Sequence, residues 1–436
     1  MVDESFKPHT SRQTLAFFLL LSMPMIVLAM AQSEFLSLGD TFGAELSKII
    51  RRVGVGCLGV LAVWTTCRTI NLKVDPVRLT YIAVFTVISL MLVATASLSF
   101  VDLLINAAFL VVFWQIVDGA KYRVATKWMM LVIIFLSTLT QSLIVLDVNE
   151  WIELQHRLVS GEPDPVTMFV PSKDCYHFIG CLNNDGAINF LGTARFQGYA
   201  YEPLHWAMYL IVGLVLSIGL WDEGPNKLTK TILLVVVGVL TFFLFAANSL
   251  AAALVMMFGI ALTIVGCGMR LILSFGMHRR HSIIFAAIGI FPLVLLPAFI
   301  IGFESLFFEI VVKNSGSDTG NWGSKLAFLK LDVGEFFRWV PLAQPYGFAG
   351  HNTLLQNQLV FGAAVTALTL LFLFQFSHHA AVDHVSLLWF AEFSLVVALI
   401  LFGIHSMIVG PVGIFLVLDL IWRGSASRGE VVSRDV

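Results

Sequence analysis

The segment between residues 195 and 206 carries side chains that could bind an anionic ligand. Arg195, Glu202 and His205 lie close together in the chain, among aromatic residues and at the start of a long apolar run. Pro203 suits the first turn of a helix, and Glu202 suits the positive end of such a helix. An arginine in this setting offers a planar set of donors to a phosphate. The alternative is an ordinary helix start within an aromatic belt at a membrane surface.

A second segment, residues 347 to 355, could supply a base. Gly347 and Gly350 permit a tight turn ahead of His351 and Asn352. An imidazole titrates near neutral pH and can take a proton from a hydroxyl group. The alternative is that Asn352 caps a helix while His351 is a bystander. Taken together, the two segments favour a site for a ligand that carries phosphate.

The composition places both segments in a membrane protein. The chain has 436 residues, of which 58% are hydrophobic and 12% charged, whereas soluble domains carry roughly 25% charged residues. So little charge cannot coat a water-facing surface, which excludes a soluble enzyme, a disordered chain and a fibrous protein. The formal net charge of −2 gives no nucleic-acid signature, so no nucleic-acid partner is expected.

Apolar runs of membrane-spanning length predict an all-α polytopic protein with about twelve transmembrane helices. Asn248 and Ser249 divide one long apolar stretch, and residues 403–406 divide another within 385–422, so each is interpreted as two spans. The remaining spans are predicted at 15–32, 46–66, 79–100, 103–119, 128–146, 205–221, 282–303 and 359–376.

This pattern divides the chain into six segments. They are transmembrane helices 1–5 in residues 1–146, a first long loop in 147–204, helices 6–9 in 205–303, a second long loop in 304–354, helices 10–12 in 355–422 and a tail in 423–436. The second loop contains a one-faced apolar pattern that predicts an amphipathic helix, formed by Leu326, Leu329, Val333, Phe336, Phe337 and Val340.

The distribution of Lys and Arg predicts the orientation. Sixteen lie in segments on the side of the N-terminus and three in short connections on the other side, so both termini are predicted in the cytoplasm. Both long loops then lie outside the cytoplasm. The segments 195–206 and 347–355 lie at the ends of these two loops. Cys175 and Cys181 share the first loop, where an oxidising compartment would allow them to form a disulfide.

Other clusters of polar residues indicate little. His378, His379 and His384 lie in a short cytoplasmic connection, and Glu162 and Asp164 alternate with prolines in an extended loop, so no metal site is predicted. Neither a phosphate-binding loop ending in Gly-Lys-Ser/Thr nor a Gly-x-Ser-x-Gly motif occurs in the sequence. ATP-driven chemistry is therefore not expected.

These features together resemble the O-antigen polymerase and O-antigen ligase family of bacterial inner membranes. The layout of twelve spans with two large periplasmic loops is similar over nearly the whole chain. Two short motifs carry the resemblance further: Arg195-x-x-Gly198-x-x-x-Glu202-Pro203, and His351-Asn352 followed after nine residues by Gly362.

The resemblance implies a glycosyltransferase of the GT-C type that needs no metal, nucleotide or other cofactor. Its donor would be an oligosaccharide on undecaprenyl diphosphate. A polymerase uses a lipid-linked repeat unit as acceptor, whereas a ligase uses lipid A-core. The Glu202-Pro203 form of the first motif favours the polymerase, and the ligase is the alternative. A flippase and a chain-length regulator are the implied protein partners.

The resemblance also implies roles for individual residues. Arg195 would grip the diphosphate and His351 would activate the acceptor hydroxyl, while Glu202 would either orient Arg195 or serve as a second polar contact. Family members commonly carry another arginine in the second loop. The candidates for it in this chain are Lys325, Lys330 and Arg338, and none of them aligns cleanly with the family pattern. The other expected substrate-binding residues are Gly198, His205, Asn352, Lys325 and Arg338.

A lipid or solute transporter is the alternative from another class, because twelve spans suit a transporter as well. Transporters commonly show matched repeats with broken helices. Here Pro292 and Pro297 share one predicted span that has no clear counterpart elsewhere. The sequence therefore favours an enzyme at the periplasmic face of a bacterial inner membrane.

Overall fold

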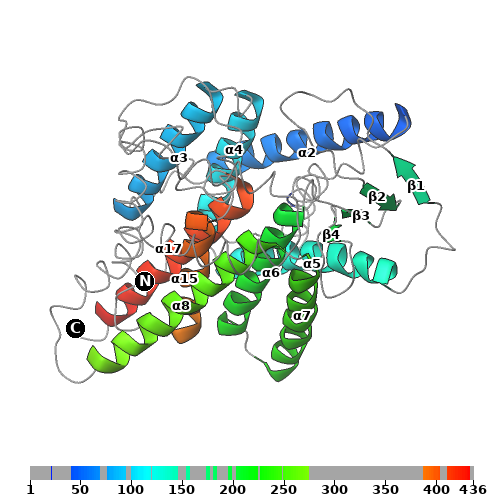
Figure 1. Ribbon diagram of the computed structural model, residues 1–436. Coiled ribbons are helices and arrows are strands. Elements are labelled where there is room, and N and C mark those ends of the chain that lie inside the picture. The colour runs from blue at the N-terminus through cyan, green and yellow to red at the C-terminus, as the bar shows by residue number, and fades with distance from the viewer. Residues whose placement is uncertain are drawn as a thin grey trace, which may run out of the picture. The chain divides into compact units, whose positions relative to one another are not determined.

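Figure 1 presents the protein as a computed structural model. The structure describes residues 21, 41–68, 76–94, 100–118, 120–145, 154–157, 173–176, 180–183, 195–198, 203–223, 226–247, 249–273, 386–402 and 410–432. The spans predicted at 282–303 and 359–376, the second long loop and nearly all of the span predicted at 15–32 lie outside these residues.

Helices occupy nine of the predicted spans in the described part of the chain. Their bounds are α2 (Thr41–Arg68), α3 (Pro76–Ala94), α4 (Phe100–Asp118), α5 (Ala120–Val145), α6 (Pro203–Glu223), α7 (Lys227–Ala246), α8 (Leu250–Leu273), α15 (Leu387–Phe402) and α17 (Pro411–Val432). Four of them contain a segment long and apolar enough to cross a membrane: Phe100–Asp118, Tyr122–Leu139, Trp206–Glu223 and Lys227–Ala246. The chain is therefore a helical membrane protein.

The two predicted helix breaks are confirmed, while several helix ends differ from the prediction. One helix ends at Ala246 and the next begins at Leu250, and the later break falls between Phe402 and Pro411. However, α5 begins at Ala120 rather than near 128, and α17 continues beyond 422. Hydropathy locates only the apolar part of a helix, so it excludes charged turns that are paired inside the protein.

The helices begin at residues that suit a first turn. Three of the described helices (α3, α6 and α17) start with proline, whose missing N–H has no partner to lose at that position. Asn226 caps α7 by accepting a hydrogen bond from the Thr229 amide at 2.8 Å. Ser386 caps α15 in the same way through the Trp389 amide at 3.0 Å.

Internal contacts divide the chain into two compact units. One unit combines Met1–Ile70 with Val111–Ala252, and the other combines Asn71–Leu110 with Ala253–Val436. The boundaries fall inside α4 and α8, so each of these helices contributes residues to both units.

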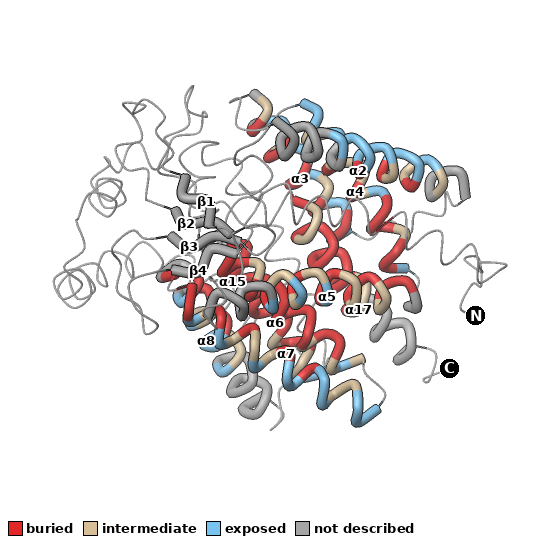
Figure 2. Tube along the Cα trace, turned by 90° about the vertical axis from the view of Figure 1, so that its right-hand side faces the viewer, coloured by how far each residue is buried: buried red, intermediate tan, exposed pale blue. Residues whose placement is uncertain are grey.

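In the first unit, α5, α6 and α7 form an antiparallel bundle with α6 at its centre. Burial covers 72% of the span Trp206–Glu223 but only 22% of Lys227–Ala246, and Figure 2 shows this contrast along the two helices. A Cβ atom on Gly213 would lie 2.8 Å from Leu240 Cδ1 and 3.2 Å from Ile134 Cγ2. Glycine therefore allows all three helices to approach closely at this level, as small residues do between membrane helices.

The outer face of α7 has the character of a lipid-facing surface. Its buried residues recur with helical periodicity and face the bundle: Leu233, Val236, Leu240, Phe243 and Ala246. Large apolar side chains occupy the other side, where Leu228, Leu234 and Phe245 are each more than half exposed. Apolar residues on both faces are typical of a helix that packs against protein on one side and hydrocarbon on the other.

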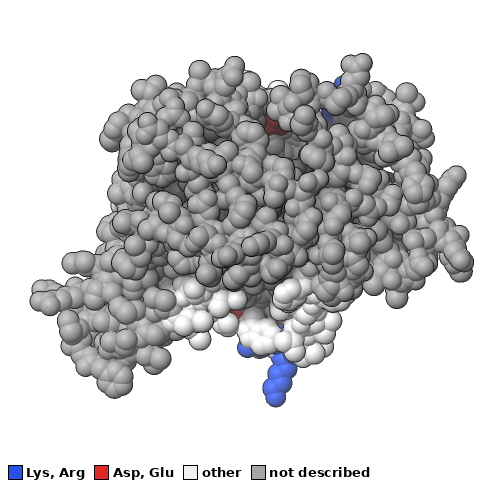
Figure 3. Space-filling view, viewed as in Figure 1, with Lys and Arg blue, Asp and Glu red and all other residues white. Residues whose placement is uncertain are grey.

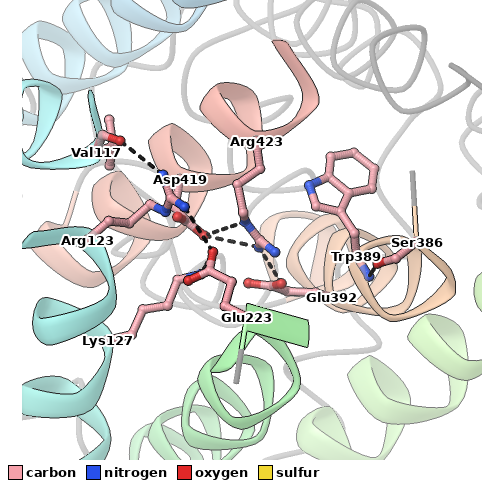
Figure 4. Close-up of polar contacts among 9 residues, drawn as sticks. All are labelled: Val117, Arg123, Lys127, Glu223, Ser386, Trp389, Glu392, Asp419 and Arg423. Carbon is pink, nitrogen blue, oxygen red and sulfur yellow. Dashed lines mark hydrogen bonds and ion pairs between the residues drawn. The ribbon is translucent and has the colours of Figure 1, made fainter. Parts of the chain in front are cut away.

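A buried ion cluster joins α5 and α6 at one end of this bundle (Figure 4). Arg123 Nη2 donates to Glu223 Oε1 at 3.2 Å, and Lys127 Nζ donates to the same oxygen at 3.1 Å. The side chains of Arg123 and Lys127 are 7% and 0% exposed. Arg123 and Lys127 fall between the spans predicted at 103–119 and 128–146, on the side predicted to be cytoplasmic. They belong instead to the first turns of α5, where Glu223 compensates their removal from water.

The second unit contains a comparable cluster between α15 and α17. Arg423 Nε donates to Asp419 Oδ2 at 3.1 Å, and the same guanidinium contacts Glu392 Oε2. Both carboxylate side chains are fully buried. In the same unit α8 approaches α15 closely, since a Cβ atom on Gly259 would lie 2.6 Å from Leu395 Cδ2.

A small antiparallel sheet forms within the first long loop. Its strands are β1 (Leu154–Arg157), β2 (Lys173–Tyr176), β3 (Gly180–Asn183) and β4 (Arg195–Gly198), in that spatial order. A register shift at Cys181/Leu182 leaves one extra residue on β4. The sequence analysis predicted no strands, so the sheet is an addition to an otherwise helical fold.

We expect Glu223→Gln to destabilise the protein. The substitution removes the carboxylate that Arg123 and Lys127 both contact, and breaking a buried ion pair from one side typically costs about 3–5 kcal/mol. Thermal unfolding in detergent micelles measures the loss. The matched control is Asp222→Asn, one residue earlier at an exposed position. Interactions of an exposed carboxylate contribute little to stability, so this variant should unfold near the wild-type temperature. Equal unfolding temperatures for the two variants would contradict the structural role of Glu223.

Candidate functional site

Arg195 lies on the strand that joins the sheet to the helices. It is the first residue of β4, which forms one edge of the described sheet and lies against α5, α6 and α7. The helix α6 begins at Pro203, shortly after this strand ends at Gly198. Two residues of the first motif, Arg195 and Gly198, therefore lie on a strand that packs against the bundle and shortly precedes its most buried helix.

The first motif leads into the positive end of α6. Amide N–H groups in the first turn of a helix have no partner within it, and they favour anions. His205 lies in this first turn, as the sequence predicted for the start of a span. Glu202 lies outside the described residues. The chain therefore carries an arginine on a strand that packs against α6, and an arginine together with the free amides of a helix start can hold a phosphate group.

The sheet and the Glu223 cluster mark opposite ends of the bundle. Contacts between Lys127 and Glu223, and between Ile134 and Gly213, show that α5 and α6 are antiparallel. The 21 residues of α6 cover about 30 Å, which is the thickness of a bilayer's hydrocarbon core. Its two ends are therefore separated by about one membrane thickness.

Further basic residues gather at the Glu223 end. Figure 3 shows Lys and Arg atoms at the lower edge of the described surface, where Figure 1 places the connection between α6 and α7. Lys227 is exposed there, and Lys230 Nζ lies 5.9 Å from the centre of the Trp221 ring. Basic residues beside a tryptophan are typical of a membrane–water interface.

The backbone register brings the two loop cysteines together. Cys175 in β2 pairs directly with Cys181 in β3, and Cys181 also pairs with Gly198 in β4. Directly opposed Cα atoms in antiparallel strands lie about 4.5–5.5 Å apart. A disulfide usually requires about 4.4–6.8 Å, so the register supports the predicted bond.

The second motif is outside the described part of the chain. It includes the expected base His351 and its neighbour Asn352. The expected substrate-binding residues Lys325 and Arg338 of the second loop also lie outside the described residues. The structure therefore brings together Arg195, Gly198 and the two cysteines, and the approach of the second motif to this site stays a prediction.

The two ion clusters and the sheet are the features that sequence reasoning missed. Arg123 and Lys127 are four residues apart, and so are Asp419 and Arg423, which places each pair on one helix face. This spacing of charged residues in the sequence could have indicated clusters of charge on the helices. No sequence pattern linked the long-range partners Glu223 and Glu392 to these cations. Within the described residues no group of three or more His, Cys, Asp or Glu side chains could hold a metal ion.

One glycine pattern in the sequence has a structural explanation. Gly54, Gly56 and Gly59 fit Gly-x-Gly-x-x-Gly, a spacing used in dinucleotide binding. That function requires a turn between a strand and a helix. Here the three glycines lie in the interior of α2, so the pattern does not indicate a nucleotide site.

Comparison of the chain with protein-family models, with curated proteins and with solved structures finds no match. The functional assignment therefore depends on the residues and the geometry described above.

We predict that Cys175 and Cys181 form a disulfide. In denatured protein prepared without reductant, both should resist alkylation, and reductant should make both reactive. Cys57 is the internal control, because it is a free thiol in α2 and should be alkylated under either condition. Mass spectrometry of the peptides identifies each modified cysteine. Alkylation of Cys175 and Cys181 before reduction would exclude the bond.

Proposed function

We propose that the chain is a membrane glycosyltransferase that polymerises glycan repeat units linked to undecaprenyl diphosphate. The observation that carries the proposal is the position of Arg195, on a strand packed against the helices just before the start of α6. A lipid diphosphate lies at the membrane surface, and this position meets it with a guanidinium and helix N–H groups.

The charge distribution supports a periplasmic site at the inner membrane of a bacterium. Arg123, Lys127, Lys227 and Lys230 all lie at the Glu223 end of the bundle, and the positive-inside rule assigns that end to the cytoplasm. The sheet, at the other end, then lies in the periplasm. In this orientation the cysteine pair is in an oxidising compartment.

The reaction joins two lipid-linked glycans. A hydroxyl group of the acceptor sugar attacks the anomeric carbon of the donor glycan, forming the new glycosidic bond. The bond between that carbon and the phosphate oxygen breaks, and undecaprenyl diphosphate leaves with the bonding electrons. In our proposal His351 takes the hydroxyl proton, and Arg195 offsets the negative charge that grows on the diphosphate. Glu202 orients the Arg195 guanidinium.

Analysis of surface polysaccharide after gene deletion tests this function against its competitors. A polymerase leaves lipid A-core that carries a single repeat unit. A ligase leaves bare lipid A-core together with unattached polymer, and a transporter of the lipid-linked unit leaves bare lipid A-core without polymer. The proposal requires the single-repeat product, and either of the other patterns would overturn it.

We expect Arg195→Lys to lose most polymerising activity and Arg195→Ala to lose nearly all of it. Lysine keeps the charge but lacks the planar pair of donors that binds a phosphate at two points. Polymer length on gels reports the activity, and immunoblots confirm normal protein levels. The control is Arg52→Lys, the same change at an exposed arginine of α2, which should retain wild-type polymer length. A wild-type ladder from Arg195→Lys would contradict two-point phosphate binding.

We expect His351→Gln to reduce turnover by about 10²–10⁴-fold, the usual contribution of a positioned base. Glutamine can hydrogen-bond a sugar but cannot take its proton near neutral pH. The assay uses purified protein and lipid-linked repeat units, with binding measured separately and expected to persist. His384→Gln, in the predicted cytoplasmic connection, is the matched control. Near-normal turnover of His351→Gln would leave His351 with a binding role only.

A further inference from the structure

The register of the small sheet places two further basic residues, Arg157 and Lys173, in one row with Arg195. Arg157 in β1 pairs with Lys173 in β2, Lys173 pairs with Asn183 in β3, and Asn183 pairs with Arg195 in β4. This row contains every Arg and Lys of the four described strands. It crosses the whole sheet, from the strand beside the helices to the opposite edge.

The acidic residue of the sheet belongs to the other face. Asp174 is the one acidic residue among the residues of the four described strands, and it lies one position along β2 from Lys173. Successive residues of a strand alternate between faces. Asp174 pairs with His156 in the neighbouring row. The face that carries the basic row therefore has no carboxylate among these strand residues.

The basic row has an energetic cost. Like charges placed directly opposite each other in adjacent strands destabilise a sheet, whereas opposite charges stabilise it. Arg157 and Lys173 are such a like-charged pair. An anion bound over the row would remove the repulsion, so the pair is better suited to the ligand-bound state than to the empty one.

We propose that Arg157 and Lys173 form a second anion-binding subsite, continuous with Arg195, that holds a phosphate or carboxylate group of the glycan substrates. This inference rests on the proposed function, since it assigns the substrate groups bound at the same site. Four strands at about 4.8 Å spacing give the row a length of about 14 Å. A diphosphate bound at Arg195 is too short to reach β1, so the row accommodates a separate anionic group.

Two sources provide such a group. In polymerisation the acceptor is itself lipid-linked and brings its own diphosphate. Alternatively, the repeat unit carries an acidic sugar. Both present oxygen anions that arginine and lysine bind through charge-assisted hydrogen bonds. The two sources differ in the probe that reveals them.

Binding measurements on the purified full-length protein test the subsite. Inorganic pyrophosphate is the probe for a diphosphate, and trigalacturonate is the probe for acidic sugars. We expect Arg157→Gln/Lys173→Gln to weaken binding of at least one probe by about tenfold or more, because hydrogen bonds between oppositely charged groups are stronger than those between neutral groups. Loss of pyrophosphate binding identifies the diphosphate as the source, and loss of trigalacturonate binding identifies the acidic sugar.

Two further variants separate binding from folding. Arg157→Lys/Lys173→Arg keeps both charges and should retain most of the affinity. His156→Gln changes the adjacent residue of β1, on the other face, and should bind both probes as wild type. Without ligand, Arg157→Gln/Lys173→Gln should unfold at the wild-type temperature or slightly above it, because the like-charge repulsion is gone.

The inference and the proposed function fail in different ways. Unchanged binding of both probes by the folded Arg157→Gln/Lys173→Gln variant would overturn the subsite, as would an equal loss in His156→Gln. Polymer analysis after gene deletion and the Arg195→Lys ladder would be unaffected by that result. Conversely, a ligase or transporter pattern after deletion would overturn the proposed function whether or not the probes bind at Arg157 and Lys173.

Discussion

The described architecture of the first unit depends on one constraint, that charges withdrawn from water must be matched by other charges inside the protein. Glu223 receives hydrogen bonds from Arg123 and Lys127, so the first turns of α5 and the last turn of α6 lie at the same level. The close packing at Gly213 then keeps the helices together along their length. The length of α6 is about the thickness of a bilayer's hydrocarbon core. The ion cluster at Glu223 fixes one end of this helix and therefore also determines where its other end lies.

At that other end, the chain uses a different structure to hold the residues proposed to bind the ligand. Four short strands present polar and basic residues at defined positions, and α6 begins shortly after β4 ends. A loop of this length without pairing would leave its arginines in many conformations, at a large entropic cost on binding. Backbone pairing places Arg195 relative to the helices before any ligand arrives. The fold therefore supplies preorganisation where the proposed chemistry needs it.

The sequence predicted the helices well because hydropathy is a local property. The breaks at Asn248–Ser249 and near residue 403 could be read directly from interrupted apolar runs. The start of α5 could not be predicted in this way. A buried lysine at position 127 is tolerated because it pairs with Glu223, which is distant in sequence. The strands were also beyond prediction: Lys173-Asp174-Cys175-Tyr176 shows no apolar alternation, and its structure comes from pairing with neighbours. Of the candidate site, Arg195 and its position before α6 were predictable, but the row that it shares with Lys173 was not.

The bond between Arg423 and Glu392 also bears on how the protein is made. Glu392 lies in an otherwise apolar helix, and its partner is 31 residues closer to the C-terminus. During synthesis α15 leaves the ribosome first, so its carboxylate has to wait for α17 before the contact can form. A lone charge inside a hydrocarbon layer opposes insertion. The arrival of α17 therefore favours the stable integration of α15, and a nascent chain that stops before Arg423 lacks the ion pair that this buried carboxylate makes in the folded protein.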